Sequence, residues 1–157
     1  MEDLSWGVEM RCTKRVQRFL SLSAMERSLF IQALFLILLF RVALPVVRFR
    51  RAWACLAGMA SIRPEDMKRR IVIQPEKTGA ALVRASRYVP GATCLMQALA
   101  GVLMLRRQGH IAELCIGVAK PNGEFGAHAW VECGGRQVVG TKADFTTLIR
   151  IEMTRMA

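Results

Sequence analysis

The sequence predicts an α+β fold in which N-terminal helices are followed by a central helix packed on a small antiparallel sheet. Apolar residues recur at helical spacing through the first part of the chain. The pattern then changes to the alternation that is typical of half-buried strands, and short turn sequences separate the alternating segments. Helices first and strands afterwards is the order expected of an α+β protein.

The length of 157 residues is that of one ordinary domain. We expect residues 1–20 to form a basic N-terminal arm or short helix, and residues 21–157 to form the folded domain. The net charge of +11 favours an acidic partner. Charge alone does not decide whether that partner is nucleic acid, an anionic membrane or an acidic peptide. The five cysteines include no CxxC pair, and the first residues lack the apolar core of a secretory signal, so we expect a cytoplasmic protein.

The first long helix is predicted to begin at a capping box. Ser23 and Glu26 have the spacing at which each side chain satisfies the other's backbone donor. The apolar stretch at 29–47 follows, and we interpret it as a buried or interface helix, because Arg41 lies near its end and is costly in a bilayer. Three further arginines come next: Arg48, Arg50 and Arg51. Because they suit an anionic surface, membrane association through this helix stays open.

Two more elements are expected before the central helix. The segment 51–60 is predicted to be helical, and a connector containing Pro64 and Pro75 follows it. A further helix is expected over 77–89. It should end there, because the residue before Pro90 is pushed out of the helical region.

The central helix has the clearest boundaries. Thr93 is a good N-cap and Gly109 a suitable C-cap, and the residues between them form a broad apolar face. Cys94 therefore lies in the first turn of a long buried helix. Three strands are predicted beyond it, at 111–119, 126–132 and 136–140, and the tail at 141–153 is assigned no element.

Cys94 has the best environment for a nucleophile. A helix N-terminus carries free N–H groups and a partial positive charge, which lower the pKa of a thiol and can hold an oxyanion. Cys55 and Cys115 fall inside apolar elements, Cys12 lies in the basic arm, and Cys133 lies in a turn. We expect these four to have no catalytic role.

The two histidines differ in their surroundings. His110 follows a helix end and is expected on the surface, whereas His128 lies within a strand beside Trp130. His128 is compatible with a general base, a metal ligand or a core histidine. A closed zinc site needs four ligands, usually with CxxC or similar spacing, and the chain has none of that spacing. We therefore expect no metal and no cofactor.

Together these residues resemble a known family, the transglutaminase-like cysteine peptidases of lasso-peptide biosynthesis. The resemblance is carried by "ATCLMQALAGVLMLRRQGHIAELCIGVAKPNGEFGAHAWVECGGRQVVG" and, upstream, by "LSAMERSLFIQALFLILLFRVAL". Its features are Cys-Leu at a helix start, a basic pair and a glycine at the helix end, the "IGV" strand and "AHAWVE". It covers about residues 20–150. "HAW" alone is common among transglutaminase-like proteins, and the combination in this order is more specific.

The resemblance implies a transglutaminase-like or papain-like fold in which Cys94 is the nucleophile and His128 the general base. Its substrate would be a lasso precursor peptide, cut between leader and core. The chain is similar to the stand-alone form of the family, which works with a separate small leader-recognition protein, and the lasso cyclase would act on the released core. Nucleic acid is not expected as a partner.

The chain departs from the family at one position. The pattern places an orienting aspartate on the strand after the histidine, and alignment of "RQVVG" puts Gly140 there. Asp144 is the candidate third member, and an amide or a backbone carbonyl is the alternative. Glu132 faces the same side as His128 but lies roughly 13 Å along the strand, too far for contact.

The missing aspartate motivates an alternative function, a catalytically degenerate transglutaminase-like domain that binds peptide or partner proteins. A third reading, a small basic protein that binds membranes or nucleic acid, rests on the net charge of +11 and the apolar segment.

Overall fold

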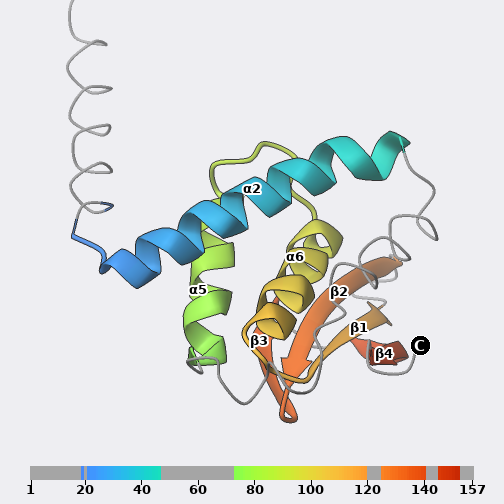
Figure 1. Ribbon diagram of the computed structural model, residues 1–157. Helices are drawn as coiled ribbons and strands as arrows, with labels where there is room; N and C mark the ends of the chain where they lie inside the picture. The colour runs from blue at the N-terminus through green and yellow to red at the C-terminus, as the bar shows by residue number, and fades with distance from the viewer. Residues whose placement is uncertain (1–18, 20, 47–72, 120–124, 141–144, 153–157) are drawn as a thin grey trace, which may run out of the picture.

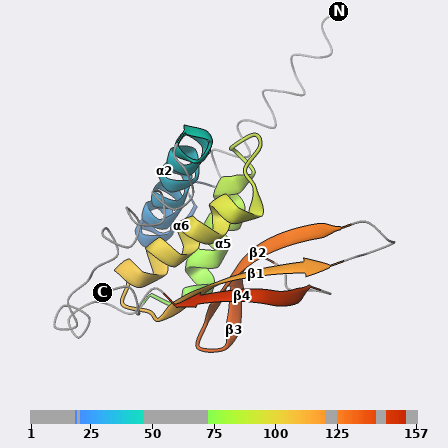
Figure 2. The ribbon, with the colours of Figure 1, turned by 90° about the vertical axis from the view of Figure 1, so that its right-hand side faces the viewer.

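The computed structural model describes residues 19, 21–46, 73–119, 125–140 and 145–152. Within these parts the chain forms three helices beside a four-stranded antiparallel sheet (Figure 1), which confirms the predicted α+β class. The elements are α2 (Ala24–Val46), α5 (Pro75–Ser86), α6 (Cys94–Arg107), β1 (Ala112–Ala119), β2 (Gly126–Cys133), β3 (Arg136–Val139) and β4 (Thr146–Glu152). Figure 2 shows the helices gathered on one side of the sheet.

Helix α2 begins at the predicted capping box. The amide of Glu26 donates to Ser23 Oγ (3.2 Å), and the amide of Ser23 donates to the Glu26 carboxylate (3.0 Å). The helix continues through Pro45 to its last residue, Val46. One face packs into the core through Leu29, Ala33, Leu36, Ile37 and Phe40. This face of α2 is therefore in the protein core, as expected of a buried or interface helix.

Helix α5 is shifted from its predicted bounds of 77–89. It begins at Pro75, because proline is well suited to the first helical position, where its missing N–H costs nothing. It ends at Ser86, and tight turns follow in which the amide of Val89 donates to the Ser86 carbonyl (3.2 Å). The predicted helix at 51–60 and residues 1–18 of the predicted arm lie outside the described residues.

Helix α5 also packs against β3 with an unusually close backbone approach. A Cβ atom at Gly79 would overlap the carbonyl oxygen of Val138, which lies in β3. Gly79 is buried, so no solvent-filled space separates the two elements there. The contact between α5 and the sheet edge thus depends on the absence of a side chain at this position.

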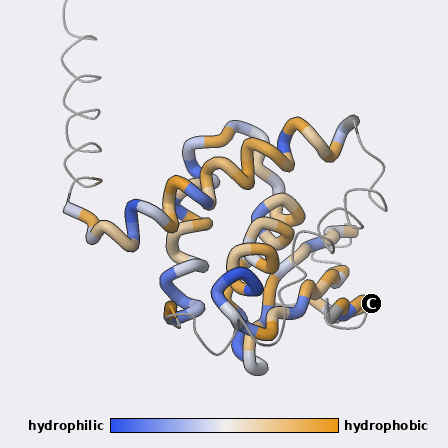
Figure 3. The backbone as a smooth tube through the Cα atoms, in the orientation of Figure 1, coloured by the Kyte–Doolittle hydropathy of each residue, from blue (hydrophilic) through white to orange (hydrophobic). Residues whose placement is uncertain are grey.

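Helix α6 lies at the centre of the fold, in contact with α2, α5 and three of the strands. Thr93 caps it as predicted, since its hydroxyl accepts from the amide of Met96 (3.4 Å). The C-cap is Gln108, and Gly109 follows it with a φ of 91°. Every residue from Ala98 to Leu105 is buried. Figure 3 shows this apolar helix ending in a hydrophilic turn, where Arg106 and Arg107 lie.

The sheet has the strand order β3-β2-β1-β4. The first three strands form the predicted meander. The tail contributes a fourth strand that the sequence pattern does not predict, β4, which pairs with β1 on the side away from β2. The core therefore lies between the helices and one face of the sheet, where Leu114, Ala129, Val131 and Val139 belong to the same buried cluster as α6.

Candidate active site

Cys94 is the first residue of α6. It is half-buried and packs against the hydrophobic core. Thr93 adopts an extended conformation directly before it, so the chain turns sharply into the helix at the thiol. This is the helix N-terminus that the sequence predicted, and its first backbone N–H groups lie beside the thiol.

His128 is the third residue of β2 and is half-buried. Its ring centroid lies 5.0 Å from that of Phe145 and 6.4 Å from that of Trp130, with only 16° between the planes of His128 and Trp130. The aromatic neighbours restrict the imidazole on two sides. Phe145 comes from the segment just before β4, which the sequence did not identify as part of the site.

Cys94 and His128 lie at the same end of the molecule. Helix α6 packs on β2, and the two elements begin at the same end and run in the same direction (Figures 1 and 2). Strand alternation, however, directs Ala129 and Val131 towards the helices and His128 towards the opposite face. In this structure the thiol and the imidazole therefore lie at the same end of the fold but on different sides of the sheet.

Gly140 lies beside the imidazole. It directly follows β3 and has a φ of 82°, in the left-handed region that favours glycine. A Cβ atom built there would be 3.3 Å from His128 Nε2. The same Cβ would be 3.0 Å from Trp130 Cβ and 3.1 Å from the Ala129 carbonyl oxygen, so a side chain here is crowded as well as strained. The position where the family pattern expects an aspartate thus borders the imidazole but favours glycine. Asp144 lies outside the described residues.

Trp130 is a core residue. It is fully buried, and its indole N–H donates to Glu132 Oε1 (2.9 Å). The second oxygen of Glu132 lies 2.9 Å from Arg150, which also contacts Glu113 at 2.6 Å. The bond with Glu113 raises the pKa of the Arg150 guanidinium. Glu132, the last residue of the "HAWVE" motif, is thus a buried carboxylate, and a buried carboxylate requires a charged partner.

The same residues form a cluster with metal-ligand character. Glu113, Cys115 and Glu132 could offer three ligand atoms within 4.8 Å of one another. The guanidinium of Arg150 already contacts both carboxylates and supplies the positive charge. We therefore interpret the cluster as an ion-pair network.

The remaining cysteines have surroundings that differ from those of Cys94. Cys115 is fully buried, and burial raises the pKa of the Cys133 thiol, which disfavours the reactive thiolate. Cys12 and Cys55 lie outside the described residues.

The expectation for His110 is wrong in one respect. Its ring is half-buried, and Nε2 lies 2.6 Å from the Ile73 carbonyl oxygen, so it ties the end of α6 to the segment before α5.

A cysteine that begins the central helix, packed on an antiparallel sheet that carries a histidine, defines a class of α+β domain suited to thiol chemistry. A family model described as the transglutaminase-like superfamily matches residues 38–150, from α2 to β4. This match spans more than half of the chain, and the protein belongs to that superfamily. Searches of curated proteins and of solved structures found no match.

Proposed function

We propose that the protein is a cysteine peptidase that removes the leader peptide from a lasso precursor peptide. The observation that carries the proposal is the placement of Cys94 at the start of the central helix of a transglutaminase-like domain, with His128 on the adjoining strand at the same end. The superfamily includes cysteine proteases and transglutaminases. The lasso-specific part of the proposal rests on the sequence motifs.

In the proposed reaction the Cys94 sulfur attacks the carbonyl carbon of the peptide bond between leader and core. The imidazole lies on the sheet face away from α6, so the proposed reaction requires the two side chains to come together when the substrate binds. His128 then takes the thiol proton and gives it to the leaving amine, so the C–N bond breaks and a thioester forms. Water, deprotonated by His128, then hydrolyses the thioester and restores the thiol. The backbone N–H of Cys94 is suited to hold the oxyanion, because it belongs to the first turn of α6.

We propose two kinds of partner for this reaction. A separate small recognition protein presents the precursor, as the resemblance to the stand-alone form of the family implies. A lasso cyclase uses the released core. The chemistry needs neither a metal nor a cofactor, since the thiol and the imidazole supply all the proton transfers.

The test is to incubate the full chain with a candidate precursor and its recognition protein, and to analyse the products by mass spectrometry. We expect a single cut between leader and core, which prior alkylation of the chain with iodoacetamide abolishes. An intact precursor that nevertheless binds the chain would support the degenerate, peptide-binding alternative instead.

A prediction concerns the group that orients His128. If the Asp144 carboxylate serves that role, Asp144→Asn should lower kcat by about tenfold or more, because a histidine without its orienting acid is held less often in the reactive geometry. The measurement is the rate of precursor cleavage, with Asp66→Asn as the matched control. An unchanged rate would assign the role to an amide or a backbone carbonyl.

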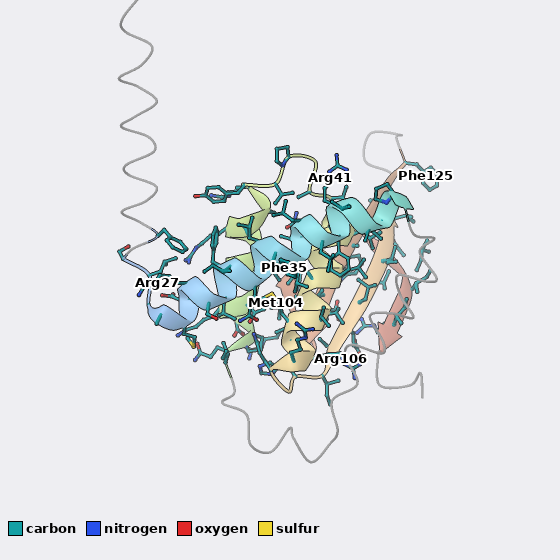
Figure 4. All side chains as sticks on the ribbon, turned by 45° about the horizontal axis from the view of Figure 1, so that its top comes forward. Arg27, Phe35, Arg41, Met104, Arg106 and Phe125 are labelled. Carbon is teal, nitrogen blue, oxygen red and sulfur yellow. The ribbon has the colours of Figure 1, made fainter. Side chains whose placement is uncertain are left out.

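We propose a cytoplasmic location with the outer face of α2 resting on an anionic membrane surface. By length and composition α2 could cross a bilayer, but one face of it is in the protein core. Five large apolar side chains on α2 are 42% to 69% exposed: Ile31, Phe35, Leu38, Leu39 and Val42. In Figure 4, Phe35 lies along α2 between Arg27 and Arg41. An apolar stripe with flanking arginines is suited to a helix that lies in the headgroup region.

Co-sedimentation with vesicles that contain phosphatidylglycerol tests this location. We expect the wild-type chain to sediment with these vesicles and Phe35→Glu to lose at least about tenfold in vesicle affinity, since it places a charge in the apolar contact. Leu148→Glu is the matched control, because Leu148 is equally exposed (63%, against 64% for Phe35) on a different element. Equal loss in both variants, or no sedimentation of the wild type, would contradict the proposal.

A further inference from the structure

A cavity of about 550 Å³ lies between the start of α2, the residues before it and the end of α5. Its lining residues are Phe19, Ser21, Leu22, Phe30, Arg84, Arg87 and Tyr88. We call this cavity the aromatic groove.

Three rings in the groove contact one another edge to face. The ring centroids of Phe19 and Phe30 are 5.5 Å apart, and those of Phe30 and Tyr88 are 5.6 Å apart. Tyr88 is about half exposed (49%). The groove therefore presents an aromatic surface that can take an apolar side chain with little rearrangement.

The charge of the groove is positive. Arg84 and Arg87 are both exposed, and none of the lining residues is acidic. Arg84 also borders a smaller cavity that contains Glu26 and Glu76, so its charge is partly met within the chain. Arg87 does not border that cavity. Arginine beside an aromatic surface binds carboxylates well, because the guanidinium offers several donors and retains little water.

The groove is close in sequence to the reactive thiol. Tyr88 precedes Cys94 by six residues, so their Cα atoms are at most about 20 Å apart even if the connection were fully extended. The connection is held in place by the amide of Ala92, which donates to the Val89 carbonyl (3.1 Å), and by Arg41, which donates to the Pro90 carbonyl (3.4 Å). An extended peptide of about six residues is long enough to span that largest separation.

We propose that the aromatic groove binds an acidic segment of the substrate polypeptide that contains an apolar side chain, and thereby places the peptide bond to be cut at Cys94. This inference rests on the proposed peptidase function, because the peptide held in the groove is the one that Cys94 attacks. Its apolar side chain contacts the three rings, and its carboxylates pair with Arg87 and Arg84. Binding at a distance from the reacting bond then supports catalysis by positioning.

The experiment uses the full chain with the Cys94→Ala substitution, so that binding is measured without cleavage. The probes are two fluorescein-labelled synthetic peptides, one of alternating glutamate and leucine with a tryptophan, and one with glutamine in place of each glutamate. We expect the acidic peptide to bind at least about tenfold more tightly by fluorescence anisotropy. Arg87→Glu and Tyr88→Ala should each weaken its binding by about tenfold or more.

Lys77→Glu is the matched control. Lys77 is exposed on the same helix and outside the aromatic groove, and it undergoes the same change of charge. Lys77→Glu should change the affinity for the acidic peptide by less than about twofold, because Lys77 lines the smaller cavity rather than the groove and exposed charges are screened by salt. Arg87→Gln, with thermal unfolding of each variant, separates loss of binding from loss of folding. Equal binding of both peptides, or equal weakening by Lys77→Glu and Arg87→Glu, would overturn the proposal.

The same variants separate this inference from the peptidase function. In the active chain, Arg87→Glu should raise KM for the precursor while leaving kcat nearly unchanged. Cleavage that is insensitive to Arg87 would overturn the groove assignment and leave the peptidase function standing. Binding that depends on Arg87 in a chain that never cuts would overturn the peptidase function and leave the groove as a peptide site.

Discussion

Replacement of Cys94 by alanine is expected to lower kcat/KM for precursor cleavage by at least about a thousandfold, because it removes the sulfur that forms the thioester in the proposed mechanism. The helix should be little affected. Alanine is the best helix former, and the cap is made by Thr93 rather than by Cys94. The measurement is product formation under single-turnover conditions with the recognition protein present.

Cys133→Ser is the control for this prediction. Cys133 is also half-buried, but it lies at the end of β2, and burial raises the pKa of its thiol. We expect cleavage within about twofold of the wild-type rate, since a protonated thiol is a poor nucleophile. A chain in which Cys94→Ala cuts as fast as wild type would show that the proposed mechanism is wrong.

Gly79→Ala is expected to destabilise the fold by about 1–3 kcal/mol, the cost typical of forcing extra volume into a packed core. Helix propensity alone predicts the opposite sign, because alanine in a helix interior is favoured over glycine by about 1 kcal/mol. The overlap of the new Cβ with the Val138 carbonyl oxygen decides the sign, since a backbone atom of β3 cannot move aside as a side chain can. Urea unfolding followed by circular dichroism measures the change.

The neighbouring residue provides the control. Ala80 is exposed on the same helix, so Ala80→Gly should cost only the propensity difference of about 1 kcal/mol. If Gly79→Ala were instead to raise the unfolding midpoint, α5 and β3 would not be in the close contact described above.

Local chemistry in the sequence was enough to predict the start of two helices. Ser23 with Glu26, and Thr93, are capping residues whose partners lie within three positions, so their hydrogen bonds need no information from the rest of the fold. The predicted start of α5 was wrong because Pro75 is compatible with either a connector or a first helical turn. Only the fold of the surrounding segment decides whether Pro75 lies in a connector or in the first turn of a helix.

The tail was harder to predict because β4 is an edge strand. Leu148, Ile149 and Arg150 are all exposed, so the strand lacks the clear alternation of a half-buried one. Missing β4 meant missing Arg150 and its ion pairs with Glu113 and Glu132, which are distant in sequence. It also hid Phe145 beside His128.

The sequence by itself determined the fold class, the helix that begins with Cys94, the meander that carries His128 and the glycine at position 140. Each depends on hydrophobic periodicity, on helix caps or on a short motif. All of these involve residues that are close together in the sequence. The tertiary structure alone decided which sheet face the imidazole occupies relative to α6, that Gly140 lies against that imidazole, and that Trp130 and Glu132 form a buried network with Arg150. These depend on strand register and on packing between distant segments, which no local pattern specifies.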